Sequence, residues 1–414
     1  MNLTHLSQPI KFKVPKDSKL IDLIVKGQGV FIFSNQDTTE NAVFKIYNSL
    51  RTDGLIVQFS TYGIQVKRIS NNQYYSDPLC ERALTDKRGA YYWFSIDAQN
   101  KRLLAGLGEA RLETIFYSHN LIDNDAKYFL ESLDVITIDE NQQIIPLVLL
   151  RDPITSRTPL YIKNKNELTM EDIALTRYMP IANLNNICQK LYNCISGPQF
   201  ILDTPDFPDF SQAIEYSIAT PGCWCYNKLQ EKAREFNPDK PNINETYIRI
   251  TLGENNGDSP GVPYVMEIWP KGHYSPIHNH AFSNAIIRVL HGEINVKLYP
   301  FLCQEKEENY IAPFGVSNFK KDEVTWITAN LNQIHQLKNI STETTCITIQ
   351  CYMYNNEDVK HYDYFDYITD GGDKAEYEPD RDMEFIEFKE KMRKEWNNRD
   401  LPKVNPKKKR ARKN

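Results

Sequence analysis

The sequence has little of what a membrane, secreted or disulfide-bonded protein needs. Its longest strongly apolar run, Ile144 to Leu150, is far shorter than the roughly 20 residues that cross a bilayer. The first residues contain no apolar segment of a secretion signal. The eight cysteines are scattered, without the spacing of a disulfide framework or a four-cysteine zinc site. We therefore expect free thiols, an intracellular location and no membrane contact.

Charge is unevenly placed along the chain. Residues 403–414 carry seven Lys or Arg and no acid, so removing their +7 from the net −5 leaves −12 for the rest. Such an acidic body is not a nucleic-acid-binding domain by its overall field. The run Lys407–Lys413 fits a nuclear localisation signal, a weak polyanion contact or a solvated tail. Asn, Ile, Lys and Tyr are abundant, as in AT-rich genomes including large DNA viruses, so cytoplasm, nucleus and virion all stay open.

The chain is too long for one ordinary core, and its patterns divide it into five parts. Residues 20–165 contain short aromatic or β-branched runs between turn residues, which predict an antiparallel β-sandwich. Residues 166–240 place apolar side chains at helical spacing. Residues 241–395 are rich in strand patterns again and end with one helix. We interpret residues 1–19 as an arm with little structure and residues 396–414 as a basic disordered tail, and we expect a mainly β, multidomain fold.

Two neighbouring strand patterns mark the sandwich: YYWFSID, which begins at Tyr91, and RLLAGLGEA. They make residues 20–125 similar to the β-sandwich domain named after farnesoic acid O-methyltransferase, which implies a binding or assembly module with a carbohydrate or protein partner. The Tyr91–Trp93 run could stack on a sugar or fill the core, the commoner fate of strand aromatics. Gly106 and Gly108 lack the third glycine of a dinucleotide loop and indicate a tight strand or turn.

Histidine is scarce, yet five of the eight histidines fall between His273 and His335. His278 and His280 are two residues apart, which places both side chains on one face of an extended strand. Together with His335 they form a candidate three-histidine metal site in a small β-barrel. The other two, His273 and His291, fit this site less well. We expect both at the surface, with His291 at a hairpin tip.

The segment from Gly272 to Gly292 has a glycine, five residues, His-x-His and a later glycine at a turn. This pattern resembles the first cupin motif, and His335 followed by Asn339 fits the second. The resemblance implies a C-terminal cupin barrel, a double-stranded β-helix or jelly roll, preceded by helices. It also implies that the metal ligands are His278, His280 and His335.

Most cupins carry a glutamate shortly after the His-x-His, where this chain has Asn284 and Ala285. Two histidines and one carboxylate leave a divalent ion with a net charge of +1, whereas three neutral imidazoles leave the full +2. Such a centre favours an anionic ligand from the substrate, for example a thiolate, which the metal helps to deprotonate.

A closer resemblance, over about residues 211–365, is to the cysteine dioxygenase family of thiol dioxygenases. Tyr247-Ile248-Arg249 matches the family's Tyr-x-Arg strand, whose arginine holds the substrate carboxylate, a task that suits a guanidinium. Trp269 matches the tryptophan before the histidines, and Tyr352 the active-site tyrosine. The resemblance implies an Fe(II) enzyme that oxidises a small carboxylate-bearing thiol, cysteine or a relative, to its sulfinate with O2. It assigns catalysis to Tyr352, Arg249 and Tyr247, and substrate contacts to Arg249, Trp269 and Gln350.

Two positions depart from that family. Many animal members have a cysteine, crosslinked to the tyrosine, where this chain has Ala285. The family's Ser-x-His-x-Tyr relay reads Thr348-x-Gln350-x-Tyr352, and glutamine forms hydrogen bonds but does not titrate. These departures keep an alternative open: a catalytically degenerate metal-binding cupin that serves as a binding or structural protein.

Overall fold

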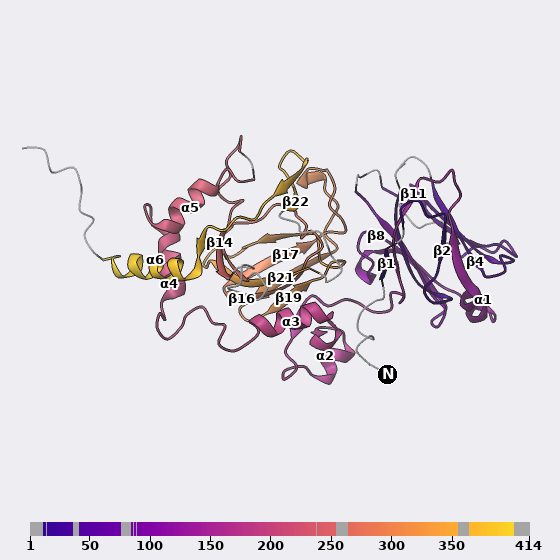
Figure 1. Cartoon of the computed structure of the whole chain (residues 1–414), viewed down its shortest axis with the longest axis horizontal. Helices are drawn as coiled ribbons and strands as arrows, with labels where there is room; N and C mark the ends of the chain where they lie inside the picture. The colour runs from indigo at the N-terminus through magenta and orange to yellow at the C-terminus, as the bar shows by residue number, and fades with distance from the viewer. Residues whose placement is uncertain are drawn as a thin grey trace, which may run out of the picture.

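The structure is a computed structural model, and its mainly β, multidomain fold matches the prediction. Figure 1 shows a sandwich at one end of the long axis, a barrel in the middle and helices at the other end. Among the helices of the described residues, none has the length and apolar character to span a membrane. The described residues are 11–13, 15–35, 41–75, 84–85, 87, 89–236, 238–253, 264–354 and 364–400.

Two antiparallel sheets form the sandwich, and one short helix, α1 (Ala126–Ser132), lies within its chain. The order of the six-stranded sheet is β1 (Lys11–Lys13), β11 (Ile144–Leu150), β3 (Gln28–Asn35), β7 (Tyr92–Asp97), β8 (Arg102–Leu107) and β9 (Ile115–Asn120). The order of the five-stranded sheet is β2 (Leu20–Asp22), β10 (Leu133–Thr137), β4 (Ala42–Asn48), β5 (Gly54–Ser60) and β6 (Gly63–Arg68).

Aromatic side chains from both sheets fill the sandwich core. Phe33 of β3 meets Phe44 of β4 and Phe59 of β5 edge to face, at ring-centroid distances of 5.4 and 5.1 Å. Such edge-to-face pairs stabilise by about 0.5–1.5 kcal/mol beyond their buried area. Tyr92 and Trp93 are almost fully buried, so the core interpretation of these two is right and they offer no platform for a sugar. A carbohydrate or protein partner of the sandwich stays a prediction.

The interpretation of residues 1–19 as an arm with little structure is wrong for β1. Lys11–Lys13 pairs with Val148–Leu150 at the edge of the six-stranded sheet, which satisfies backbone groups that β11 would otherwise leave open. The basic tail was predicted from residue 396, but helix α6 (Phe385–Asn397) continues into it. Residues 1–10 and 401–414 lie outside the described residues.

Two further sheets face each other and form the cupin barrel, with a hairpin of β22 (Phe365–Ile368) and β23 (Lys374–Tyr377) beside them. The eight-stranded sheet contains β13 (Met179–Pro180), β12 (Ile162–Lys163), β19 (Val324–Ile327), β16 (Asn284–His291), β21 (Cys346–Met353), β15 (Tyr264–Trp269), β14 (Ile248–Gly253) and β24 (Met383–Glu384). The three-stranded sheet contains β18 (Gly315–Lys320), β17 (Glu293–Leu298) and β20 (His335–Lys338).

Gly292 is the corner at which the chain leaves one sheet for the other. Its φ is +70°, and a Cβ here would come within 2.5 Å of the Thr345 carbonyl oxygen, so only glycine fits. β16 and β17 therefore belong to different sheets. The prediction that His291 lies at a hairpin tip is wrong. After this corner, side chains alternate along β17, and Ile294, Val296 and Leu298 are buried in the barrel.

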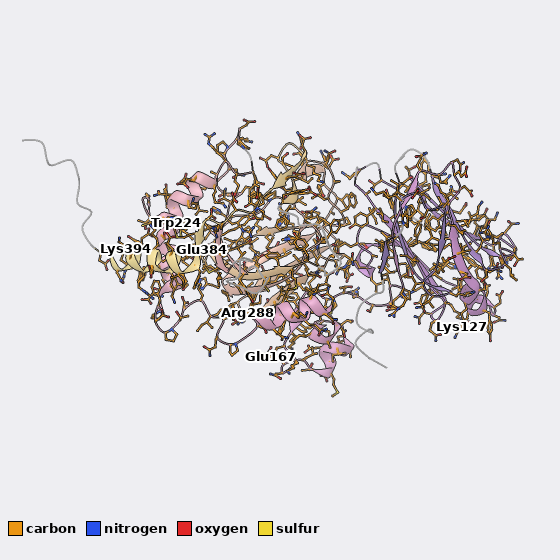
Figure 2. All side chains as sticks on the ribbon, viewed as in Figure 1. Lys127, Glu167, Trp224, Arg288, Glu384 and Lys394 are labelled. Atoms are coloured by element: carbon orange, nitrogen blue, oxygen red, sulfur yellow. The ribbon has the colours of Figure 1, made fainter. Side chains whose placement is uncertain are left out.

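The predicted helices form, and four of them cover the outside of the eight-stranded sheet. α3 (Asn186–Ile195) lies on one part of it, and α4 (Phe210–Ala219), α5 (Trp224–Lys232) and α6 lie on another (Figure 1). α2 (Met170–Ala174) precedes α3, and its Met170 and Ile173 side chains are exposed. Arg288 of β16 donates to the carbonyl oxygens of Ile195 and Gly197 at 3.0 and 3.1 Å, which caps the end of α3 (Figure 2).

The sandwich and the barrel share a packed interface. Phe301 and Cys303, in the connection after β17, belong to the hydrophobic core of the sandwich. On the other side, Gly108 has a φ of +82°, and a Cβ there would collide with Pro300. The prediction of a tight strand or turn is confirmed, since Gly106 lies in β8 and Gly108 follows it with a positive φ, and Gly108 is needed for close approach of the two parts.

We predict that Gly108→Ala lowers the free energy of unfolding by about 1–3 kcal/mol, because it adds both a strained φ and a collision with Pro300. The matched control is Gly197→Ala, since a Cβ at Gly197 has nothing within 4 Å. We expect this control to stay within about 0.5 kcal/mol of the parent protein. Urea unfolding curves of both variants test this, and equal stability would contradict the interface.

Candidate metal centre

His278 and His335 are brought together by their own backbones. The amide of each donates to the carbonyl of the other at 3.0 Å, which forms an isolated antiparallel bridge. The His-x-His segment is therefore an extended stretch before a turn, and not part of a regular strand as predicted. Ala281 and Phe282 follow with φ of +46° and +63°, which turns the chain directly after His280.

The three imidazoles converge on one point. One ligand atom from each ring lies within 4.8 Å of the others, and the Nε2 atoms of His280 and His335 are 3.0 Å apart. Two nitrogens bonded at about 2.1 Å to one ion lie about 3.0 Å apart when they meet at a right angle. The spacing therefore fits two neighbouring ligands of one metal ion, with the third ring on the same face.

A hydrogen bond on the far side of the His278 ring fixes which of its nitrogens faces the centre. His278 Nδ1 lies 3.0 Å from the carbonyl oxygen of Pro276, and the Nε2 atoms of His280 and His335 face each other. A ring that donates from Nδ1 keeps the lone pair of Nε2 for a metal. His280 Nδ1 finds no partner among the described residues. The donor set thus fits a divalent transition metal.

Burial keeps these rings neutral. It lowers the pKa of His278 to about 4, with a smaller contribution from Arg249. Burial also lowers the pKa of His280 and of His335 well below the ordinary range, and the neighbouring histidines add to this effect. Neutral imidazole is the form that binds metal, so the site needs no proton release near neutral pH.

An ion pair lies in the wall beside the histidines. Arg249 of β14 and Glu267 of β15 are directly opposite each other in the sheet, and Arg249 Nε is 4.0 Å from a Glu267 carboxylate oxygen. Both side chains are buried. Burial raises the pKa of Glu267, and the positive charge of Arg249 opposes that effect. The guanidinium that the resemblance assigns to a substrate carboxylate therefore already has an anionic neighbour.

A chain of hydrogen bonds continues from Glu267 toward the metal ligands. The Gln350 amide donates to Glu267 and to Thr348 Oγ1, the latter at 3.2 Å, and the Tyr352 hydroxyl donates to Gln350 Oε1. The Tyr352 ring stacks on His280 at a centroid distance of 5.8 Å. Burial raises the pKa of Tyr352 well above its ordinary value, and Glu267 adds to this. Tyr352 is therefore a neutral hydroxyl beside the histidines.

Two aromatic rings form another part of the wall. Tyr247 and Trp269 stack at a centroid distance of 4.2 Å. Both are buried, and Trp269 Nε1 has no acceptor among the described residues. The neighbours of Arg249 along its strand point the other way, because Ile248 and Ile250 pack against the helices. Tyr247 and Arg249 therefore face the cavity, while Ile248 and Ile250 face the helices.

All of the predicted site residues line one cavity of about 40 Å³. One water needs roughly 10–15 Å³ of such space, so the cavity suits a small molecule. The predicted residues along its wall are His278, His280, His335, Tyr247, Arg249, Trp269, Gln350 and Tyr352.

Sequence reasoning missed several lining residues, among them two beside the histidines, and it misplaced His273. Glu267 and Phe365 line the cavity, and Glu267 was detectable because it shares a strand face with Trp269. His273 was expected at the surface but is buried, and its Nδ1 lies 2.9 Å from the Thr246 carbonyl oxygen. Ala285 is directly opposite Tyr352 in the sheet, the place at which the family's crosslink would form.

We predict that the metal-free protein loses stability as pH falls from about 6.5 to about 4. The unfolded chain takes up protons on these histidines near pH 6.5, whereas folded His278 does so only near 4. The unfolded state then binds more protons, so acid favours unfolding. Urea unfolding of chelator-treated protein at several pH values measures the slope. His278→Gln, His280→Gln and His335→Gln combined should flatten it, and an unchanged slope would refute this assignment.

Solved cupin structures cover about a quarter to a third of this chain. The Schizosaccharomyces pombe Cnp3 cupin domain is 15% identical, with a TM-score of 0.21, over 26% of this chain and 65% of that one. Oxalate oxidase in complex with glycolate is 18% identical, with a TM-score of 0.21, over 30% and 56%. A cupin superfamily protein from Desulfitobacterium hafniense is 12% identical, with a TM-score of 0.20, over 27% and 79%.

Sequence comparison is more specific about the barrel. Cysteine dioxygenase type 1 of Danio rerio is 24% identical over 106 residues, which are 26% of this chain and 50% of that protein. The chain thus spans about half the length of this curated relative. The sequence profile of the family described as cysteine dioxygenase type I matches residues 243–364, the part that contains the histidine triad. Residues 243–364 are a cysteine dioxygenase-like cupin segment.

Proposed function

We propose that this protein is an Fe(II)-dependent thiol dioxygenase that acts on a small carboxylate-bearing thiol, cysteine or a close relative. The observation that supports it most is a triad of neutral imidazoles facing the same small cavity as a buried arginine. In the reaction R–SH + O2 → R–SO2H, both oxygen atoms end on sulfur. The sulfur loses four electrons, O2 gains them, and the thiol proton passes to the sulfinic acid or to solvent.

His278, His280 and His335 would hold the iron, which supplies open coordination positions and redox chemistry when it is bound. Because the three imidazoles bring no negative charge, the full +2 of the ion favours a thiolate. The cavity wall completes the environment, since Tyr247 and Trp269 exclude water from the space that the substrate occupies.

The Arg249–Glu267 pair suggests which head group the thiol carries. A guanidinium binds a carboxylate well, and a carboxylate beside it accepts an ammonium group. Their charges cancel, so the pair has little net attraction for a plain anion. A molecule with both an ammonium and a carboxylate group meets a partner for each. We therefore favour an aminothiol acid such as cysteine over a mercaptocarboxylate that lacks the amine.

Tyr352 holds a proton beside the histidines. Its raised pKa keeps the hydroxyl protonated, and the Gln350 carbonyl oxygen orients it. Gln350 cannot take up that proton, so proton transfer through Tyr352 would end at this residue. We assign Tyr352 to positioning an oxygen-bearing group near sulfur, and Arg249 to holding the substrate.

One observation favours the alternative of a binding or structural cupin. Arg249 already has Glu267 as an ionic neighbour, so its charge is satisfied without a substrate. That protein would bind metal but would not consume O2 with any thiol.

We predict that Fe(II)-loaded protein consumes O2 with cysteine. Arg249→Gln should reduce kcat/KM for cysteine and 3-mercaptopropionate by about 10–100-fold, because a charged hydrogen bond to their carboxylate is lost. Cysteamine, which has no carboxylate, should lose far less. An oxygen electrode measures the rates, and metal analysis of each variant checks that iron is retained.

No O2 uptake by iron-loaded protein with any of the three thiols would refute the dioxygenase. An equal loss for cysteamine and cysteine in Arg249→Gln would leave the dioxygenase standing but reject the clamp role of Arg249.

We predict that Glu267→Gln reduces the preference for cysteine over 3-mercaptopropionate by about tenfold, since the acceptor of the ammonium group is lost and Arg249 is freed for a plain carboxylate. The matched control is Glu323→Gln, because Glu323 lines the same cavity but bonds the Lys320 amide at 2.6 Å. An unchanged ratio of kcat/KM in Glu267→Gln would contradict the assignment of Glu267.

A further inference from the structure

We propose that Glu109 and Arg111, two residues of the N-terminal sandwich, are positioning residues of the metal centre in the barrel. The sandwich is then part of the scaffold that holds the histidines, in addition to any partner it binds. This inference rests on the triad binding a metal. It does not depend on turnover or on which thiol is the substrate.

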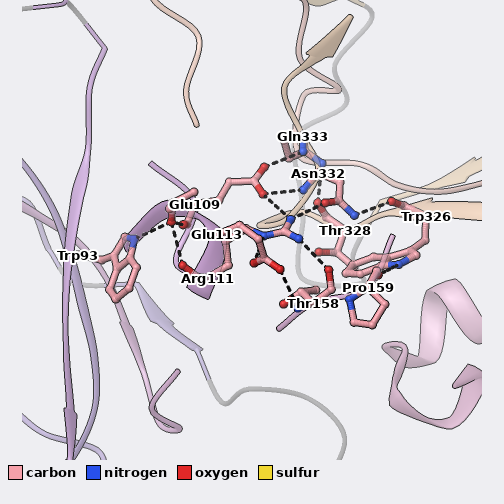
Figure 3. A network of polar contacts seen from close by, with 11 residues as sticks. Trp93, Glu109, Arg111, Glu113, Thr158, Pro159, Trp326, Thr328, Asn332 and Gln333 are labelled. Atoms are coloured by element: carbon pink, nitrogen blue, oxygen red, sulfur yellow. Dashed lines mark hydrogen bonds and ion pairs between the residues drawn. The ribbon is translucent and has the colours of Figure 1, made fainter. Parts of the chain in front are cut away.

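Glu109 reaches across the interface into the loop before His335. Its side chain is buried, and its two carboxylate oxygens accept the backbone amides of Asn332 and Gln333, each at 2.9 Å (Figure 3). One carboxylate therefore holds two successive amides of the loop that leads to a metal ligand. Charge-assisted hydrogen bonds of this kind are about twice as strong as neutral ones.

Arg111 fastens this carboxylate to the sandwich side. Its Nη1 donates to Asn332 Oδ1 at 2.7 Å and lies 3.4 Å from Glu109, while its Nε donates to Glu113 at 2.9 Å and its Nη2 to the Thr158 carbonyl at 2.8 Å (Figure 3). Arg111 is 2% exposed, so the guanidinium has one fixed geometry. Burying such a pair costs desolvation energy that apolar contacts would avoid. The hydrogen bonds of the pair instead fix the position and orientation of the loop at Asn332.

The same loop residues lie beside His335 and the turn after His280. Burial lowers the pKa of the His335 ring, whereas the Asn332 backbone raises it, and Asn332 itself has a left-handed φ of +62° that its neighbours must stabilise. The Gln333 side chain accepts the Phe282 amide at 3.0 Å and donates to the Ser283 carbonyl at 2.9 Å. Glu109 thus holds a residue that orients His335 and another that fixes the turn after His280.

Apolar packing makes the interface firm enough for this role. Ile277 and Ile334, the neighbours of His278 and His335, pack with Tyr299, and Leu302 borders the same cluster. Phe301, next along the chain, enters the sandwich core. The hydrogen bonds from the sandwich therefore act on a loop that packing already holds in place. Residues that support a metal site need such a fixed position.

The test is metal affinity in the full chain. After removal of metal with a chelator, Co(II) is titrated into Glu109→Gln while its visible absorption is followed. Loss of outer-shell partners of ligands costs roughly 10–100-fold in metal affinity, and Glu109 acts through Asn332, so we expect about tenfold weaker binding and an altered spectrum. Wild-type affinity with an unchanged spectrum would overturn the proposal.

The matched control is Asp53→Asn, which breaks another ion pair of the sandwich, Asp53 with Arg68 at 2.9 Å, in the β4–β5 turn. We expect it to lower thermal stability but to leave Co(II) affinity within about twofold, a few tenths of a kcal/mol. An equal loss of affinity in both variants would show a general stability effect and overturn the proposal.

If Glu109→Gln does not fold, Arg111→Lys is tested in its place. Weaker Co(II) binding by that variant supports the proposal, and unchanged binding overturns it.

Discussion

The reciprocal backbone hydrogen bonds between His278 and His335 are the constraint on which the barrel half of this structure depends. They place two ligands from segments far apart in the sequence side by side, and the turn after His280 brings in the third. Since the bonds are made by the main chain, they hold whether or not a metal is present. Burial then keeps the imidazoles neutral, which is the state a metal needs.

Around this fixed triad the polar groups form one connected row. Tyr352, Gln350 and Glu267 are joined by hydrogen bonds, and Glu267 lies opposite Arg249. The row has no net charge, because the charges of the arginine and the glutamate cancel. Arg249 and Glu267 form a dipolar pair, and this is the physical basis for proposing a zwitterionic thiol.

Local patterns predicted most of the barrel. The family resemblance identified Tyr247 and Arg249, and two-residue spacing identified His278 and His280. The same rule places Glu267 on the face of Trp269, so that residue was within reach of sequence reasoning. Glu109 was not, because its partners Asn332 and Gln333 are 223 and 224 residues away and no periodicity connects them. His273 was misjudged because a turn position says nothing about the Thr246 carbonyl that binds its ring.

The fate of the oxygen atoms tests the account most directly. Iron-loaded protein is incubated with cysteine under ¹⁸O2, and the product is identified by mass spectrometry. We predict cysteine sulfinate in which both sulfinate oxygens are labelled, as the proposed reaction requires. Unlabelled sulfinate, cystine alone or unchanged cysteine would contradict a dioxygenase built on this triad.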